Sequence, residues 1–272
     1  MTTLTATLIE RDVVMVSGVD AGEYLQTQLT RDVLALDPGA SAWSFLLGPK
    51  SEIVALLRVT RSESDTFLLD VEPGWGDTVR NRIDGLLFRM DVSFDQGCWP
   101  GIAWRGGSPD AVDAPIFATT PWQGVEGVDS VGPDVAVPEG VALVSREALD
   151  EMRIRAGWPA MGSDLESSIR PAMTGLVDRT ISFDKGCYTG QEFVARVHYR
   201  GAEPPKRLVR IANEGGASLP VGAPIVVAGD EVGTVTSSGI GVALGYLKRG
   251  IETPASGSVG DITVEIGGSQ SV

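Results

Sequence analysis

Residues 185–192 read Lys-Gly-Cys-Tyr-Thr-Gly-Gln-Glu, and no other stretch of this 272-residue chain is as informative. Thr189, followed three residues later by Glu192, forms a capping-box pattern that predicts a helix beginning near Gly190. An apolar stripe at helical spacing continues the pattern: Phe193, Val194 and Val197. The unpaired N–H groups of the first turn, with the positive end of the helix dipole, face back toward Cys187.

Cys187 and Lys185 are the candidate catalytic residues of this stretch. A neighbouring ammonium group and a helix N-terminus both lower a thiol pKa, which starts from ~8.5 and reaches ~3.5 to ~7.5 in strong cases. Because Cys187 precedes the predicted cap by two residues, we expect an effect at the weaker end. Four roles remain open for the thiol: nucleophile, redox thiol, transient ligand for a metal or sulfur, or buried packing residue.

Composition narrows the class of protein. The net charge of −14 disfavours broad electrostatic binding to nucleic acid or to an anionic membrane. Two cysteines do not make a disulfide framework, and the single histidine, His198, gives no support to a zinc site, so no metal site is expected. The sequence contains neither an apolar run long enough for a membrane helix nor a signal-peptide pattern. We therefore expect a cytoplasmic protein.

One segment has the opposite charge balance. Between residues 185 and 210 two acidic residues, Glu192 and Glu203, stand among six basic ones: Lys185, Arg196, Arg200, Lys206, Arg207 and Arg210. A local excess of positive charge attracts small anions. The alternative is a solvated surface whose charges balance nearby acids.

The order of predicted elements indicates an α+β fold. Strands near residues 13–16, 43–47, 53–59 and 67–71 alternate irregularly with helices after Asp20, from 77 to 90 and after Ser145. Residues 101–140 predict long loops and short strands. Beyond Pro204-Pro205, short strands at 207–211, 224–229, 231–238, 241–247 and 261–266 predict a small antiparallel barrel. We expect a body over residues 1–203 and a barrel domain over 204–272, with Cys98 as a structural residue of the body.

The motif around Cys187 resembles the signature of the YgfZ-type folate-binding proteins, which are relatives of the aminomethyltransferase of the glycine cleavage system. The resemblance includes Ser182-Phe183-Asp184 before the motif and Arg200-Gly201 after it, and it continues in residues 18–33. It implies a folate-binding body with interlocked subdomains, a C-terminal barrel and a central cavity for tetrahydrofolate. It also implies a role in maintaining or assembling iron–sulfur enzymes, and an effect on tRNA modification.

The resemblance suggests binding roles for five residues near the thiol. Gln191 and Glu192 are expected to order the loop, and Tyr188 to offer a flat wall to a pterin ring. Arg196 and Arg200 are expected to attract the folate tail or a partner protein.

The chain departs from the family pattern at two places. Ala55 and Leu56 stand where aminomethyltransferases carry an acidic pair, so a general acid or base is missing there. Met173 replaces a glutamate that hydrogen-bonds the pterin in many relatives.

The sequence therefore favours a tetrahydrofolate-binding accessory protein that supports iron–sulfur cluster assembly or repair through Cys187, with iron–sulfur client or assembly proteins as partners. The alternatives are a folate-dependent aminomethyl or methyl transferase, and a folate-binding module associated with tRNA modification. Direct binding of nucleic acid or membrane is not expected.

Overall fold

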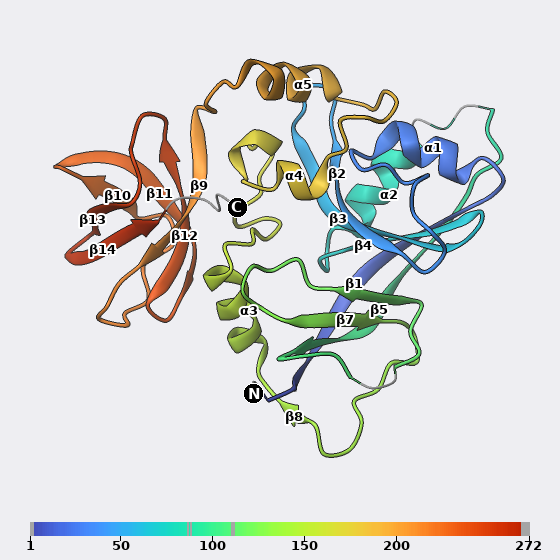
Figure 1. The fold of residues 1–272 in the computed structure, drawn as a ribbon, viewed down its shortest axis with the longest axis horizontal. Helices are drawn as coiled ribbons and strands as arrows, with labels where there is room; N and C mark the ends of the chain where they lie inside the picture. Colours follow the sequence, from blue (N-terminus) through green and yellow to red (C-terminus); the bar gives the residue numbers. More distant parts are fainter. Residues whose placement is uncertain (1–2, 86, 88, 110–111, 268–272) are drawn as a thin grey trace. The chain divides into compact units, whose positions relative to one another are not determined.

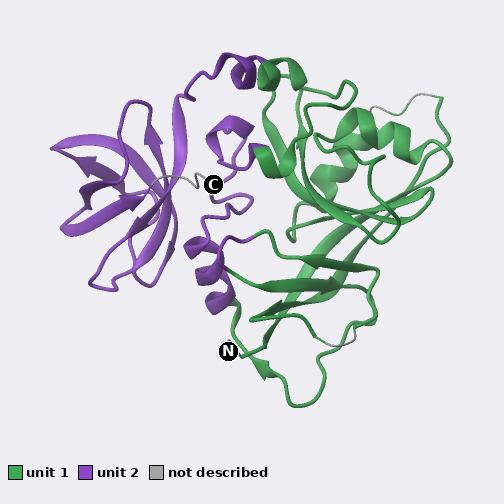
Figure 2. Cartoon of the chain, in the orientation of Figure 1, with its two compact units in different colours: residues 1–121, 125–146, 178–195 green, residues 122–124, 147–177, 196–272 purple. Residues whose placement is uncertain are grey.

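The computed structural model describes residues 3–85, 87, 89–109 and 112–267. They belong to two compact units, shown in Figure 2. Unit 1 contains Met1–Pro121, Val125–Arg146 and Asp178–Ala195, and unit 2 contains Trp122–Gly124, Glu147–Val177 and Arg196–Val272. The division at residues 203 and 204 stays a prediction, since unit 2 joins the segment before it to the barrel. Among the described residues, no helix has the length and apolar character needed to cross a membrane.

Unit 1 is built on one eight-stranded sheet with the order β2-β3-β4-β1-β5-β7-β6, and β8 pairs in parallel with β1 (Figure 1). Its strands are β1 (Thr5–Ser17), β2 (Ser41–Leu47), β3 (Ile53–Glu63), β4 (Thr66–Val71), β5 (Ser93–Arg105), β6 (Ile116–Thr119), β7 (Gly127–Val131) and β8 (Ala142–Leu143). Its helices are α1 (Ala21–Gln28) and α2 (Gly76–Asp84). The short α4 (Val177–Thr180) and the longer α5 (Gln191–Arg200) follow later in the chain.

Strand β5 adds a long strand that the sequence pattern did not predict. It runs for 13 residues alongside β1 and ends at Arg105, inside the segment 101–140 where long loops and short strands were expected; the remainder of that segment contains the short β6 and β7. The first part of β5 pairs with β1 alone, and β7 joins from Gly101 onward. Pro100 is therefore tolerated because it lies where one side of the strand is still an edge. The helix predicted over 77–90 is also shorter, since α2 ends at Asp84; residues 86 and 88 lie outside the described residues.

Unit 2 contains the barrel that the sequence predicted. Six antiparallel strands close in the order β10-β11-β12-β9-β14-β13. They are β9 (Lys206–Ala212), β10 (Pro224–Val227), β11 (Asp230–Gly239), β12 (Val242–Lys248), β13 (Ala255–Val259) and β14 (Ile262–Gly267). Alternate residues such as Val209, Ile211 and Val235 point into one apolar core. The fold class, α+β with a C-terminal antiparallel barrel, is confirmed.

The preceding segment of unit 2 contains a buried ion pair whose carboxylate is hydrogen-bonded to the barrel. It contains α3 (Arg146–Arg155) and the 3₁₀ turn η1 (Pro171–Met173). The Arg153 guanidinium donates to Asp164 at 3.0 Å. The Asp164 carboxylate also accepts hydrogen bonds from the hydroxyls of Thr236 and Ser237 on β11. This carboxylate therefore has partners on both sides of the packing surface within unit 2.

A charged network lies buried in the sheet of unit 1. Arg58 on β3 donates two hydrogen bonds to Asp70 on β4, at 2.8 and 3.1 Å, and Arg11 on β1 donates a third at 2.8 Å. Asp129 on β7 accepts from Arg58 at 3.2 Å and from Arg105 at 2.9 Å. Burial raises the pKa of the Asp70 carboxyl, but the guanidinium groups of Arg58 and Arg11 outweigh it and hold that pKa below its usual value. The network thus links five strands through two carboxylates.

Replacing Asp70 with Asn tests the energetic importance of this network. Asp70→Asn removes the carboxylate that accepts two hydrogen bonds from the buried Arg58 and leaves only the longer contact with Asp129, so the free energy of unfolding should fall by about 3–5 kcal/mol in urea titrations at pH 7. Asp84→Asn, which breaks the exposed pair with Arg80 on α2, is the control and should cost about 0.5 kcal/mol or less. Equal losses for the two variants would contradict the account.

The ion pair of Asp70 with Arg58 predicts that the free energy of unfolding depends on pH. Because the folded pKa of Asp70 is lowered, its contribution is present above the unfolded value of about 3.9 and is lost as the pH falls through the folded pKa. The difference in stability between wild type and Asp70→Asn should therefore shrink below about pH 4. A difference that stays constant down to pH 2 would argue against ionisation of Asp70 as the source.

Candidate functional site

The chain approaches Cys187 along the C-terminal end of α1. Thr30 donates its hydroxyl to the Thr180 carbonyl at 2.7 Å, and its own carbonyl accepts the Ser182 N–H at 3.0 Å. The Ser182 hydroxyl accepts the Asp32 N–H at 3.1 Å. These contacts join segments about 150 residues apart in sequence and fix the start of the thiol loop, a name we use for residues 185–190.

Lys185 holds the thiol loop on the residues around the end of α1. Its ammonium donates to the carbonyls of Gln26 at 2.7 Å, Leu29 at 2.7 Å and Arg31 at 2.9 Å. Carbonyls at the end of a helix lack intrahelical donors, and a lysine ammonium is suited to them. Burial lowers the pKa of Lys185 to about 8, against the opposing effect of Asp32. The ammonium also lies 5.4 Å from the centre of the Tyr188 ring.

The far end of the loop is held as firmly. The Thr189 N–H donates to the Thr27 carbonyl at 3.1 Å. The Gln191 side chain accepts the Tyr188 N–H at 3.2 Å, and α5 begins at Gln191. The predicted helix start is confirmed to within one residue, but the reciprocal capping contact comes from Gln191 rather than from Glu192.

Gly190 rests on the turn between β2 and β3. Its φ of +82° is in the left-handed region, and a Cβ at this position would lie 2.5 Å from the Gly48 carbonyl oxygen. The Ser51 hydroxyl donates to the Gly190 carbonyl. A residue with a side chain would therefore both strain the backbone and collide with the turn.

Cys187 lies between these two anchored ends. Its side chain is exposed, as is Gly186, and a Cβ built on Gly186 meets nothing within 4 Å. Tyr188 is only 8 % exposed. The thiol is thus accessible rather than enclosed in hydrocarbon, while the influence of Lys185 on its ionisation stays a prediction.

The other predicted binding residues lie on α5, where the chain passes from unit 1 to unit 2. Glu192, Arg196 and Arg200 are exposed, and Val194 is the buried residue of the helix. Arg196 and Arg200 are four residues apart and therefore share one face. Their contact with a ligand stays a prediction.

The second cysteine has surroundings that the sequence did not reveal. Cys98 was expected to be structural, but it is exposed and lines an open cavity of about 410 Å³ with Asp12, Asp77, Gln96 and two glycines. Asp12 accepts the N–H groups of Gly74 and Gly76 at 2.8 and 2.9 Å. Desolvation, with the nearby carboxylates of Asp12 and Glu10, raises the pKa of the Cys98 thiol. The pairing of β1 with β5 and the contacts of both strands with the start of α2 bring these groups together, so they form no motif that is local in the sequence.

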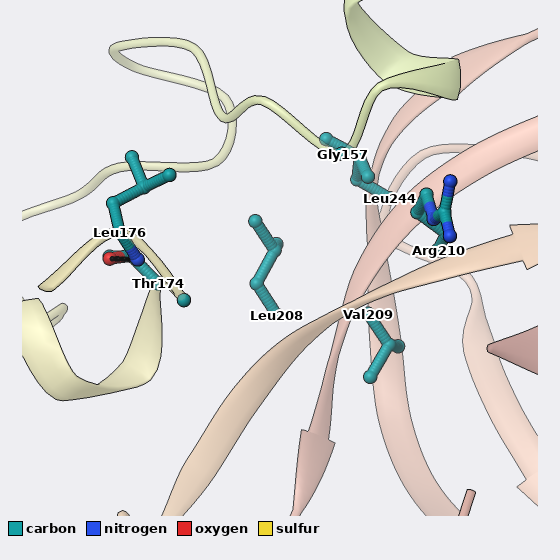
Figure 3. Close-up of a pocket in the computed structure, with 8 residues that line it drawn as sticks. Gly157, Thr174, Leu176, Leu208, Val209, Arg210 and Leu244 are labelled. Atoms are coloured by element: carbon teal, nitrogen blue, oxygen red, sulfur yellow. Dashed lines mark hydrogen bonds between the residues drawn. The ribbon is translucent and has the colours of Figure 1, made fainter. Parts of the chain in front are cut away.

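Unit 2 contains a narrow apolar pocket beside η1. It is lined by Leu176, Leu208 and Leu244 with the polar groups of Thr174 and Arg210, and its volume is about 10 Å³. Figure 3 shows the Leu208 side chain projecting from β9 between Thr174 and Gly157. A pocket of this size can hold about one water molecule.

The two departures from the family pattern are both buried. Ala55 and Leu56, on β3, are 0 % and 3 % exposed, and Met173 in η1 is 8 % exposed. Within the part of the chain that the structure describes, no group of three or more His, Cys, Asp or Glu residues is arranged to hold a metal ion.

Comparison with known proteins supports a common origin with two groups of relatives. No family model matches the chain. An uncharacterized protein of Haemophilus influenzae is 32 % identical over 201 residues, which cover 72 % of this chain and 69 % of that protein. The mitochondrial aminomethyltransferase of Gallus gallus is 25 % identical over 299 residues, 92 % of this chain and 74 % of that one. The tRNA-modifying protein YgfZ of Yersinia enterocolitica is 50 % identical over 50 residues, 18 % of this chain and 15 % of that protein.

A solved structure supports the same relationship at the level of the fold. The glycine cleavage system aminomethyltransferase T of Bartonella henselae superposes with a TM-score of 0.83 at 19 % identity, over 98 % of this chain and 86 % of that chain. From these relatives together, the chain belongs to the YgfZ-type proteins, which are related to the aminomethyltransferases of the glycine cleavage system.

Proposed function

We propose that this chain is a cytoplasmic, tetrahydrofolate-binding accessory protein that uses Cys187 to support the assembly or repair of iron–sulfur clusters in other proteins. The observation that carries the proposal is an exposed thiol on a loop that is hydrogen-bonded at both ends. A thiolate is both a nucleophile and a ligand for iron, and both uses require access from solvent. The cluster is then a substrate of the site.

The fixed ends of the loop suit a thiol that must meet a partner in one geometry. Lys185 on one side and Gly190 on the other leave only Gly186, Cys187 and the next two residues between them. Because Tyr188 is buried, the backbone beside the thiol has little freedom to turn. A ligand held in one position loses less conformational entropy when it binds.

Folate binding is the second part of the proposal. The pocket of unit 2 supports it as one edge of a binding site. Its leucine walls and the Arg210 guanidinium suit a flat ring with an anionic tail. Its volume of about 10 Å³ is too small for a pterin ring, so this pocket can supply one edge of a folate site but does not enclose the ligand. Arg196 and Arg200 remain the proposed contacts of the tail.

A transferase reaction is less well supported than an accessory role. The acidic pair of the aminomethyltransferases is replaced by Ala55 and Leu56, and both side chains are buried on β3. The nearby Glu52 carboxylate accepts the Lys50 N–H at 2.8 Å within its own turn. Two relatives are named tRNA-modifying proteins, but a net charge of −14 opposes direct binding to RNA by this chain.

The two thiols should differ in reactivity. At pH 7 we expect iodoacetamide to alkylate Cys187 at least about tenfold faster than Cys98, because desolvation, together with Asp12 and Glu10, raises the pKa of the Cys98 thiol. Peptide mass spectrometry of timed samples measures both rates in one reaction. Faster alkylation of Cys98 would contradict the assignment of Cys187 as the reactive thiol.

Loss of the thiol should abolish the function without unfolding the protein. Cys187→Ala removes an exposed side chain, so we expect a melting temperature within a few degrees of wild type. The variant should fail to restore the activity of iron–sulfur enzymes in a strain lacking the gene. Cys98→Ser, the control, should restore it. Full restoration by Cys187→Ala would overturn the proposal.

Tetrahydrofolate should bind with a measurable effect on tryptophan fluorescence, since Trp158 follows Gly157 at the edge of the pocket. Replacing both Arg196 and Arg200 with Ala should weaken binding by about fivefold or more, and added salt should reduce that difference. Arg249→Ala, an exposed arginine of the barrel unit, is the control. No saturable signal with wild-type protein would exclude folate as the ligand.

A further inference from the structure

The turn between β2 and β3 holds a residue in a conformation that its side chain disfavours. Ser51 has a φ of +61° and is completely buried. Serine rarely adopts the left-handed region, and such conformations persist where surrounding contacts fix them. Here the Ser51 N–H donates to the Gly48 carbonyl at 3.0 Å, and the Gly48 N–H donates to the backbone carbonyl of Glu52 at 2.9 Å.

One contact from α2 and one within the turn itself also fix its conformation. Arg82 on α2 donates to the Leu47 carbonyl at 2.9 Å, directly before the turn. The Glu52 carboxylate accepts the Lys50 N–H across it. The turn is therefore fixed by the sheet, by α2 and by its own side chain, independently of the thiol loop.

The thiol loop meets this turn at its own left-handed residue. The Gly190 Cα lies so close that an added Cβ would be 2.5 Å from the Gly48 oxygen and 3.3 Å from the Ser51 Cα. The Ser51 hydroxyl donates to the Gly190 carbonyl. Two residues with positive φ, 139 positions apart, thus form one contact between the turn and the loop.

We propose that Ser51 is a positioning residue for Cys187: its hydroxyl, presented by the left-handed turn, fixes Gly190 and with it the place of the thiol three residues earlier. The inference rests on the proposed use of Cys187. It assigns a role to the turn that precedes Ala55 and Leu56, where the related transferases are expected to carry their acidic pair. In this chain the turn supports a thiol loop instead.

The first test is Ser51→Gly in a Cys98→Ser background. Glycine keeps the left-handed backbone without strain and removes the small side chain with its hydroxyl, so the melting temperature should stay within a few degrees of the parent. Amide hydrogen exchange of residues 188–191 should quicken about fivefold, the amount expected for one lost hydrogen bond. Restoration of iron–sulfur enzyme activity should fall. Ser64→Gly, in the exposed β3–β4 turn, is the matched control and should change neither readout.

A second variant approaches the contact from the other side. Gly190→Ala should displace the loop through overlap with the Gly48 oxygen, and should also quicken exchange in residues 188–191. Unchanged exchange in both variants would overturn the role of Ser51, whatever the role of Cys187. Full activity of Cys187→Ala would instead overturn the proposed function, and the two failures are therefore distinguishable.

Discussion

The ammonium of Lys185 is the contact on which the arrangement of the site depends. It supplies three donors to three carbonyls around the end of α1: Gln26 lies in the last turn of the helix, where carbonyls lack intrahelical donors, and Leu29 and Arg31 follow it. At pH 7 the side chain carries all three protons, because its pKa, though lowered by burial, is about 8. A neutral or shorter side chain cannot satisfy the same three acceptors. The lysine therefore positions the thiol loop through these hydrogen bonds, apart from any effect of its charge on the thiol.

Around this contact, unit 1 brings together three segments that are distant in the sequence. Residues 26–31 supply carbonyls, residues 48–51 supply a rigid turn, and residues 185–190 supply the thiol. The sheet beneath them contains the buried pair of Arg58 and Asp70, which ties β3 to β4 and, through Arg11, to β1. The proposed function places the chemistry of the site on a thiol in a loop, on a fold that is shared with the aminomethyltransferase structure. Fold and chemistry are separable in this way because function resides in sites placed on folds.

Much of this could be predicted from local pattern, and the rest could not. Thr189 and Glu192 predicted the start of α5 to within one residue, because helix capping depends on neighbouring residues. The side chain that accepts the Tyr188 N–H belongs to Gln191 rather than to Glu192, because this contact depends on the conformation of the thiol loop. Strand alternation gave the barrel, except for β13, whose Ala-Ser-Gly-Ser run has no apolar alternation. Strand β5 was not predicted because it contains Gly97 and Pro100, two residue types that are uncommon in strands. The partners of Lys185 lie 154 to 159 residues away in the sequence, so only the tertiary fold reveals that it caps α1.

The state of the Lys185 side chain tests the account most directly. In protein with ¹⁵N-labelled lysine, the Lys185 ammonium can be assigned by the loss of its signal in Lys185→Met and followed by NMR as the pH is raised. We expect a slowly exchanging ammonium signal at pH 7 that titrates near pH 8, as burial and three carbonyl partners require. A rapidly exchanging signal with a pKa near 10.4, the value of a free lysine, would contradict the account.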